Sequence, residues 1–131
     1  MVLYMMASQC YLTGRPEAAV RYNNAQMAMR GRRDEVPYDC QGWLGGGYVF
    51  IGQPERSVEW CRAELARGRD TYAPIRATLV ITLTIAGSPN DAMVAADGLV
   101  DAAEATRNPH AISYALLAYG FAFRDTDPHR A

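Results

Sequence analysis

The sequence predicts an all-α protein, built as a right-handed stack of antiparallel helical hairpins with about seven helices. Three observations support this prediction. A turn motif recurs along the chain with almost the same neighbours each time. Apolar residues between the turns recur every three to four positions, which is the spacing of one helix face. No long segment alternates apolar and polar residues with the period of two that a half-buried strand requires.

The recurring turn places a glycine two residues before a proline. Glycine after an apolar helix supplies a left-handed C-terminal cap, and proline suits the first turn of the next helix because its missing N–H needs no partner there. An acidic residue follows, close to the positive end of the helix dipole. The clear copies are Gly14-Arg15-Pro16-Glu17, Gly52-Gln53-Pro54-Glu55 and Gly87-Ser88-Pro89 with Asp91, and a fainter copy carries Pro128, so successive prolines are 38, 35 and 39 residues apart.

These turns divide the chain into helices and repeats. Leu3, Met6 and Cys10 share one face of the first expected helix. Residues 79–85 are rich in β-branched side chains, but they occupy a helical position of the repeat and are predicted as helix. The expected helices cover about 2–13, 16–30, 37–51, 54–68, 72–86, 89–106 and 109–123, and the repeats about 1–34, 35–70, 71–107 and an incomplete 108–131.

Composition and charge restrict the classes of function. Half of the residues are apolar, as in globular proteins, and the net charge of −1 offers no basic surface for nucleic acid. Cys10, Cys40 and Cys61 form no close pairs, which indicates reduced thiols and a cytoplasmic protein. Neither a signal peptide nor a membrane-spanning segment is apparent. All 13 basic residues are arginine, which is consistent with a GC-rich genome such as that of an actinobacterium.

The repeat unit resembles the tetratricopeptide repeat, which places glycine before its second helix and a small residue inside that helix. Leu44, Gly45 and Tyr48 also match the first-helix consensus. Asn23 departs from it, because a bulky residue is usual there, and the repeat exceeds the standard length of about 34 residues. The small position is occupied by Ala19, Ser57, Ala92 and Ala131.

Residues 104–116 and 127–131 resemble the helical repeat region of large actinobacterial ATP-binding regulators of the LuxR type and of their cyclase-linked relatives. This resemblance implies a non-catalytic interaction or sensing module of a transcriptional regulator. Its partner would be another protein or the ATPase and DNA-binding domains of its own chain, and we expect the chain to be a fragment of a larger protein. Two alternatives remain: a domain that binds a small-molecule effector near the glycine-rich third helix, and a stand-alone homodimerising scaffold.

Two surfaces are candidates for binding. The tetratricopeptide resemblance implies a concave groove lined by the first helix of each hairpin, although the aromatic residues could instead fill the space between hairpins. The seventh helix would expose an apolar stripe for self-association, because the eighth helix only begins where the sequence ends. The groove candidates are Tyr4, Ser8, Tyr11, Gln41, Tyr48 and Arg76, and the self-association candidates are Ile112, Leu116, Tyr119 and Phe123.

The sequence indicates no catalytic residues, cofactor or metal. A chain without lysine cannot contain the Gly-x-x-x-x-Gly-Lys-Ser/Thr phosphate-binding loop. The glycines between positions 42 and 47 lie inside a predicted helix, where close helix packing explains them better than a ligand does. His110 and His129 have no cysteine or carboxylate at ligand spacing. Arg62, Arg67 and Arg69 are expected on an outward helix face with Glu59 and Glu64, where they would form ordinary surface pairs.

Overall fold

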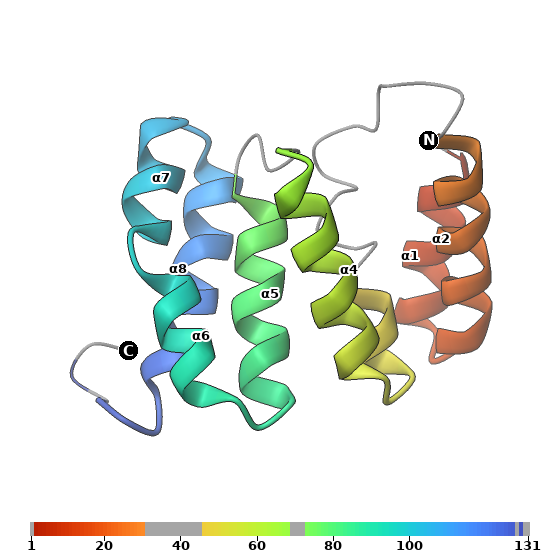
Figure 1. The fold of residues 1–131 in the computed structure, drawn as a ribbon. Helices are drawn as coiled ribbons and strands as arrows, with labels where there is room; N and C mark the ends of the chain where they lie inside the picture. Colours follow the sequence, from red (N-terminus) through yellow and green to blue (C-terminus); the bar gives the residue numbers. More distant parts are fainter. Residues whose placement is uncertain (1, 31–45, 69–72, 128, 130–131) are drawn as a thin grey trace.

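A computed structural model describes residues 2–30, 46–68, 73–127 and 129, and in this part of the chain every regular element is a helix. Residues 46–50 are also helical. The all-α prediction is therefore confirmed. The helices are α1 (Val2–Leu12), α2 (Pro16–Arg30), α4 (Pro54–Ala66), α5 (Pro74–Ile85), α6 (Pro89–Ala96), α7 (Leu99–Ala105) and α8 (Pro109–Phe123) (Figure 1).

The three clear turn motifs adopt the same backbone conformation. Each glycine has a positive φ, and the residue after it donates its N–H to the carbonyl five residues earlier, as in a Schellman cap. Proline then opens the next helix with an acidic residue in its first turn. The φ values are 69°, 73° and 77° at Gly14, Gly52 and Gly87, and the bonds are Arg15 to Cys10 (2.8 Å), Gln53 to Tyr48 (2.9 Å) and Ser88 to Leu83 (2.9 Å). Pro128 of the fourth motif lies outside the described residues.

The small position of the repeat is fully buried. Ala19, Ser57 and Ala92 each have 0% of their surface exposed. The Ser57 hydroxyl lies 3.2 Å from the Thr82 hydroxyl, so this polar residue is hydrogen-bonded between α4 and α5. A larger side chain at these positions would have to displace a neighbouring helix. Ala131 lies outside the described residues.

Helix α5 lies at the centre of the larger apolar core. It packs against α4, α6 and α8, and Ile75 and Val80 are completely buried. Two of its threonines bond their hydroxyls within the helix, to carbonyls four residues earlier. These bonds run from Thr78 to Pro74 (2.8 Å) and from Thr84 to Val80 (3.0 Å). The prediction of helix over this β-branched segment is confirmed.

A second, smaller core lies between α1 and α2. It consists of Ala7, Cys10 and Ala19, with Tyr11 and Tyr22 packed beside it. These two helices lie at one end of the molecule, and α6, α7 and α8 lie at the other (Figure 1). None of the described helices has the length and apolar character needed to cross a bilayer.

The predicted helix over 89–106 is wrong in one respect, because it is broken after Ala96. Asp97 is extended, with φ −61° and ψ 125°, and Gly98 adopts a left-handed conformation with φ 65°. Helix α7 then starts at Leu99. Glycine permits this conformation at little steric cost, whereas most residues do not.

The expectation for Glu64 is also wrong. Glu64 is only 2% exposed and pairs with Arg67, so it does not lie on the outward helix face. The pair is thus half buried, with the carboxylate inside and the guanidinium at the surface. A long-range pair joins two helices instead: Arg62 of α4 lies 3.8 Å from Asp91 of α6, and both side chains are exposed.

Candidate binding cleft

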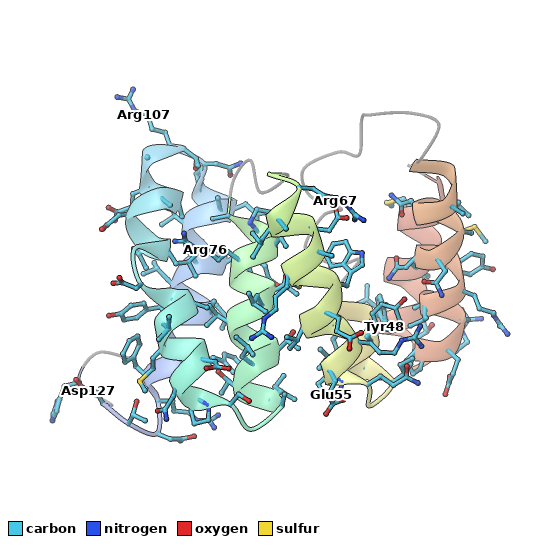
Figure 2. The ribbon with its side chains drawn as sticks, viewed as in Figure 1. Tyr48, Glu55, Arg67, Arg76, Arg107 and Asp127 are labelled. Atoms are coloured by element: carbon cyan, nitrogen blue, oxygen red, sulfur yellow. The ribbon has the colours of Figure 1, made fainter. Side chains whose placement is uncertain are left out.

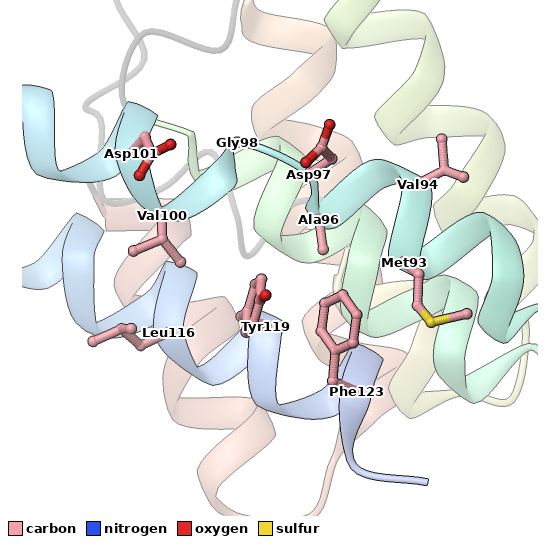
Figure 3. Close-up of a pocket in the computed structure, with 10 residues that line it drawn as sticks. All are labelled: Met93, Val94, Ala96, Asp97, Gly98, Val100, Asp101, Leu116, Tyr119 and Phe123. Atoms are coloured by element: carbon pink, nitrogen blue, oxygen red, sulfur yellow. The ribbon is translucent and has the colours of Figure 1, made fainter. Parts of the chain in front are cut away.

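The helix break opens a cleft between α6 and α7 on one side and α8 on the other (Figure 3). Its volume is about 900 Å³, near the upper end of the range of ligand pockets. Seven of its ten lining residues have apolar or aromatic side chains, although polar and apolar atoms contribute equally to its exposed surface. The lining residues are Met93, Val94, Ala96, Asp97, Gly98, Val100, Asp101, Leu116, Tyr119 and Phe123.

Apolar side chains from the two sides face each other across the cleft. Tyr119 and Phe123 point from α8 toward α6, and their ring centroids are 4.4 Å apart (Figure 3). Met93 lies near the end of the cleft, and its sulfur accepts a hydrogen bond of 3.4 Å from the Thr126 hydroxyl. Leu116 remains 53% exposed, so the cleft contains apolar surface that the chain itself does not cover.

The two charged residues of the cleft are both acidic. Asp97 and Asp101 lie on either side of Gly98, and both are exposed. Within the described part of the chain, neither carboxylate forms an ion pair. Arg76 of α5 reaches this region, where its Nη2 donates to the backbone carbonyl of Asp97 at 3.4 Å. The rim of the cleft therefore carries negative charge.

Three of the six predicted groove residues have described side chains, and they do not all lie together. Arg76 contacts the α6–α7 break, whereas Tyr48 lies between α2 and α4 (Figure 2). Gln41 lies outside the described residues, and so do the side chains of Tyr4 and Ser8, whose backbone belongs to α1. Among the three residues with described side chains, Tyr11 and Tyr48 lie close together and Arg76 lies apart from them.

Tyr11 and Tyr48 are part of a packed polar contact. The Tyr11 hydroxyl accepts a hydrogen bond of 2.8 Å from Asn23 Nδ2, and the Tyr48 hydroxyl donates one of 3.0 Å to Asn24 Oδ1. Burial raises the pKa of Tyr11 to about 12, although the Asn23 hydrogen bond acts in the opposite direction. These contacts favour the alternative interpretation, in which the aromatic residues fill the space between hairpins.

Gly47 makes that contact possible. A Cβ at this position would overlap the Tyr11 hydroxyl and lie 2.9 Å from Asn23 Nδ2. No atom lies within 4 Å of a Cβ placed on Gly46. Close helix packing therefore explains Gly47, as the sequence indicated, but not Gly46, which carries no such contact.

The predicted stripe on α8 is only partly exposed. Leu116 is exposed, Ile112 and Tyr119 are half-buried, and Phe123 is 7% exposed. The expectation is wrong for Phe123, because α6 packs over this end of α8. The sequence analysis missed the opposite wall of the cleft, and the signal that could have indicated it is the pair Asp97-Gly98 inside the predicted helix.

The described residues offer no cluster that could bind a metal ion in the cleft. Across the described ranges, no three histidine, cysteine or carboxylate side chains are placed to hold a metal ion. His110 stacks on Tyr114, with 6.5 Å between ring centroids, and is not among the cleft residues. The chemistry that the cleft offers is apolar contact combined with attraction for positive charge. No protein-family model, curated protein or solved structure matches the chain.

Proposed function

We propose that this chain is a non-catalytic protein-interaction module, built as a tetratricopeptide-like stack of helical hairpins. The repeated turn supports the proposal, since three turns have one conformation and are each followed by a fully buried small residue. Helix packing supports it too. Helices α5 and α8 are the first helices of successive repeats. They pack directly against each other, although α6 and α7 separate them along the chain, as first helices do in stacked hairpins.

The kind of protein to which this module would belong is suggested by its resemblance to the repeats of LuxR-type regulators. We propose that the chain senses or binds a protein in the cytoplasm, as part of a transcriptional regulator. In that role the module would transmit partner binding to ATPase and DNA-binding domains. The module itself would bind the protein partner.

The observation that carries the proposal is the cleft between the broken helix and α8. An open apolar surface bordered by polar groups is typical of a site that binds a protein segment. Leu116 and Val94, which are 53% and 77% exposed, would supply contact area on binding. Helical hairpin arrays bind partners through such surfaces rather than through buried active sites.

A peptide selection tests this proposal with a matched pair of variants. The intact chain is used to select binders from a random 12-residue phage library, and the selected peptides are measured against Leu116→Ser and Leu117→Ser. Both leucines are similarly exposed, at 53% and 51%, but only Leu116 lines the cleft. Binding that is weakened by Leu116→Ser and kept by Leu117→Ser supports the proposal. No enrichment, or equal effects of the two variants, contradicts it.

A small-molecule effector site is the second candidate function. The volume of about 900 Å³ favours it, because ligand pockets span roughly 300–1,000 Å³. This cleft lies at α6–α8 and not near the glycine-rich segment where sequence reasoning placed an effector. A compound library tested by thermal shift distinguishes the two functions: a stabilising compound whose effect is lost in Leu116→Ser, without any selected peptide, favours the effector site.

A homodimerising scaffold is the third possibility, and the exposed leucines of α8 favour it. Leu116 and Leu117 are adjacent and leave about half of their surface uncovered. Sedimentation equilibrium over a wide concentration range tests this function. A dimer that dissociates in Leu116→Ser would support a scaffold, and a monomer at all concentrations would exclude it.

A further inference from the structure

We infer that the partner of the cleft is a peptide segment in which an arginine or lysine adjoins large apolar side chains. This inference rests on the proposed function and names the chemistry of its partner. Two properties of the cleft lead to it: apolar lining residues that are partly uncovered, and two charged lining residues that are both acidic.

The apolar lining residues account for the apolar part of the partner. Val100 from one wall faces Leu116 and Tyr119 from the other, and Met93 lies beside Phe123 at the end of the cleft (Figure 3). The extended Asp97 and the left-handed Gly98, where α6 ends and α7 begins, line the same cleft. Apolar side chains of a partner would bury this surface at a gain of about 25 cal/mol per Å² before the cost of ordering.

The rim accounts for the basic part of the partner. Asp97 and Asp101 line the cleft, are exposed, and form no ion pair within the described chain. Arg76 bonds the carbonyl of Asp97 from α5, so its guanidinium is directed at the backbone there. A partner cation placed between the two carboxylates would gain attraction without displacing an existing pair.

The surrounding chain strengthens this charge pattern. Residues 89–127 contain six carboxylates and two arginines, although the whole chain has a net charge of only −1. Arg124 already pairs with Asp125 at 2.9 Å. Negative charge is therefore concentrated in the part of the chain that contains the cleft, which favours the approach of a cationic segment.

The same charges disfavour a second copy of the chain as the occupant. A two-fold interface uses the same surface on both subunits. Contact through this cleft would bring two acidic rims into one interface, and like charges placed together oppose association. A basic peptide meets the cleft without this repulsion.

Three synthetic peptides test the inference on the intact chain. They are 12-residue amphipathic peptides with the same leucine and phenylalanine face, and they differ only in carrying arginine, glutamine or glutamate on the other face. Fluorescence anisotropy at low salt should show the arginine peptide binding about tenfold more tightly than the glutamine peptide, with the preference reduced at high salt. The glutamate peptide should bind most weakly.

Variants of the chain test whether Asp97 and Asp101 cause the preference for the arginine peptide. Asp97→Asn with Asp101→Asn should remove the advantage of the arginine peptide, while Glu104→Gln, on an exposed residue of α7 outside the cleft, should keep it. An unchanged preference in the double variant overturns the inference, and so does equal binding of all three peptides. If the peptides bind equally and Leu116→Ser weakens them all, the proposed function stands and only the inference falls. If Leu116→Ser changes nothing, or no peptide binds, both fall.

Discussion

Replacing Gly98 by alanine distinguishes a broken helix from a continuous one by the sign of its effect on stability. In the interior of a continuous helix, alanine stabilises relative to glycine by roughly 0.5–1 kcal/mol. At the observed φ of 65°, alanine instead pays the left-handed penalty of about 1–2 kcal/mol. No atom lies within 4 Å of a Cβ built on Gly98, so the backbone alone determines the cost.

The assay is equilibrium unfolding in urea, with the midpoint and slope compared between variants. We expect Gly98→Ala to lower the free energy of unfolding by about 1–2 kcal/mol at an unchanged slope. Gly98→Asn is the control, because asparagine tolerates the left-handed region better than alanine and should cost less. An increase in stability in Gly98→Ala would refute the break, and with it the origin of the cleft.

Three further predictions concern backbone strain and packing. Arg107→Gly should stabilise the protein by roughly 0.5–1 kcal/mol in the same urea assay, because Arg107 has a φ of 54°; a loss of stability would contradict this. Gly47→Ala should destabilise by about 1–3 kcal/mol by displacing the Tyr11 hydroxyl, whereas Gly46→Ala, with no atom near its Cβ, should be neutral or stabilising; equal effects would exclude the close approach. Stability should also fall as the pH rises from about 10 to about 12, because the raised pKa of Tyr11 favours the neutral phenol in the folded state; Tyr11→Phe should show a smaller fall, and an identical pH profile would contradict the assignment.

The hairpin turns could be predicted from the sequence because their physics is local. Gly14, Gly52 and Gly87 each end an apolar helix and precede a proline, and each adopts the left-handed conformation that the motif requires. The small residues Ala19 and Ser57 could be predicted in the same way, because the repeat places them one turn into the second helix of a hairpin. Both features depend on neighbours within a few positions along the chain.

The helix break could not be predicted from periodicity. Ala92, Ala96, Leu99 and Ala103 are all fully buried, and their spacing of four, three and four residues is that of an unbroken helix. The buried face therefore keeps its register across Gly98, and a single glycine is tolerated in many helices. The cleft depends on this break, so its α6–α7 wall was missed for the same reason.

The burial of Glu64 and Tyr48 could not be predicted from the sequence pattern either. Glu64 occupies a position that the sequence assigned to the surface, yet it is 2% exposed. Tyr48 was a candidate for an open groove, but its hydroxyl reaches Asn24, which lies 24 residues away along the chain. Such contacts follow from how helices of different repeats meet, which repeat matching does not specify.

Amide hydrogen exchange of the chain with and without a peptide selected from the phage library tests the binding cleft most directly. We expect the bound peptide to slow amide exchange only at residues 93–101 and 116–123, which form the two walls of the cleft. Protection centred on α1 and residues 46–50, or no protection at saturating peptide, would contradict the assignment of the cleft as the binding site.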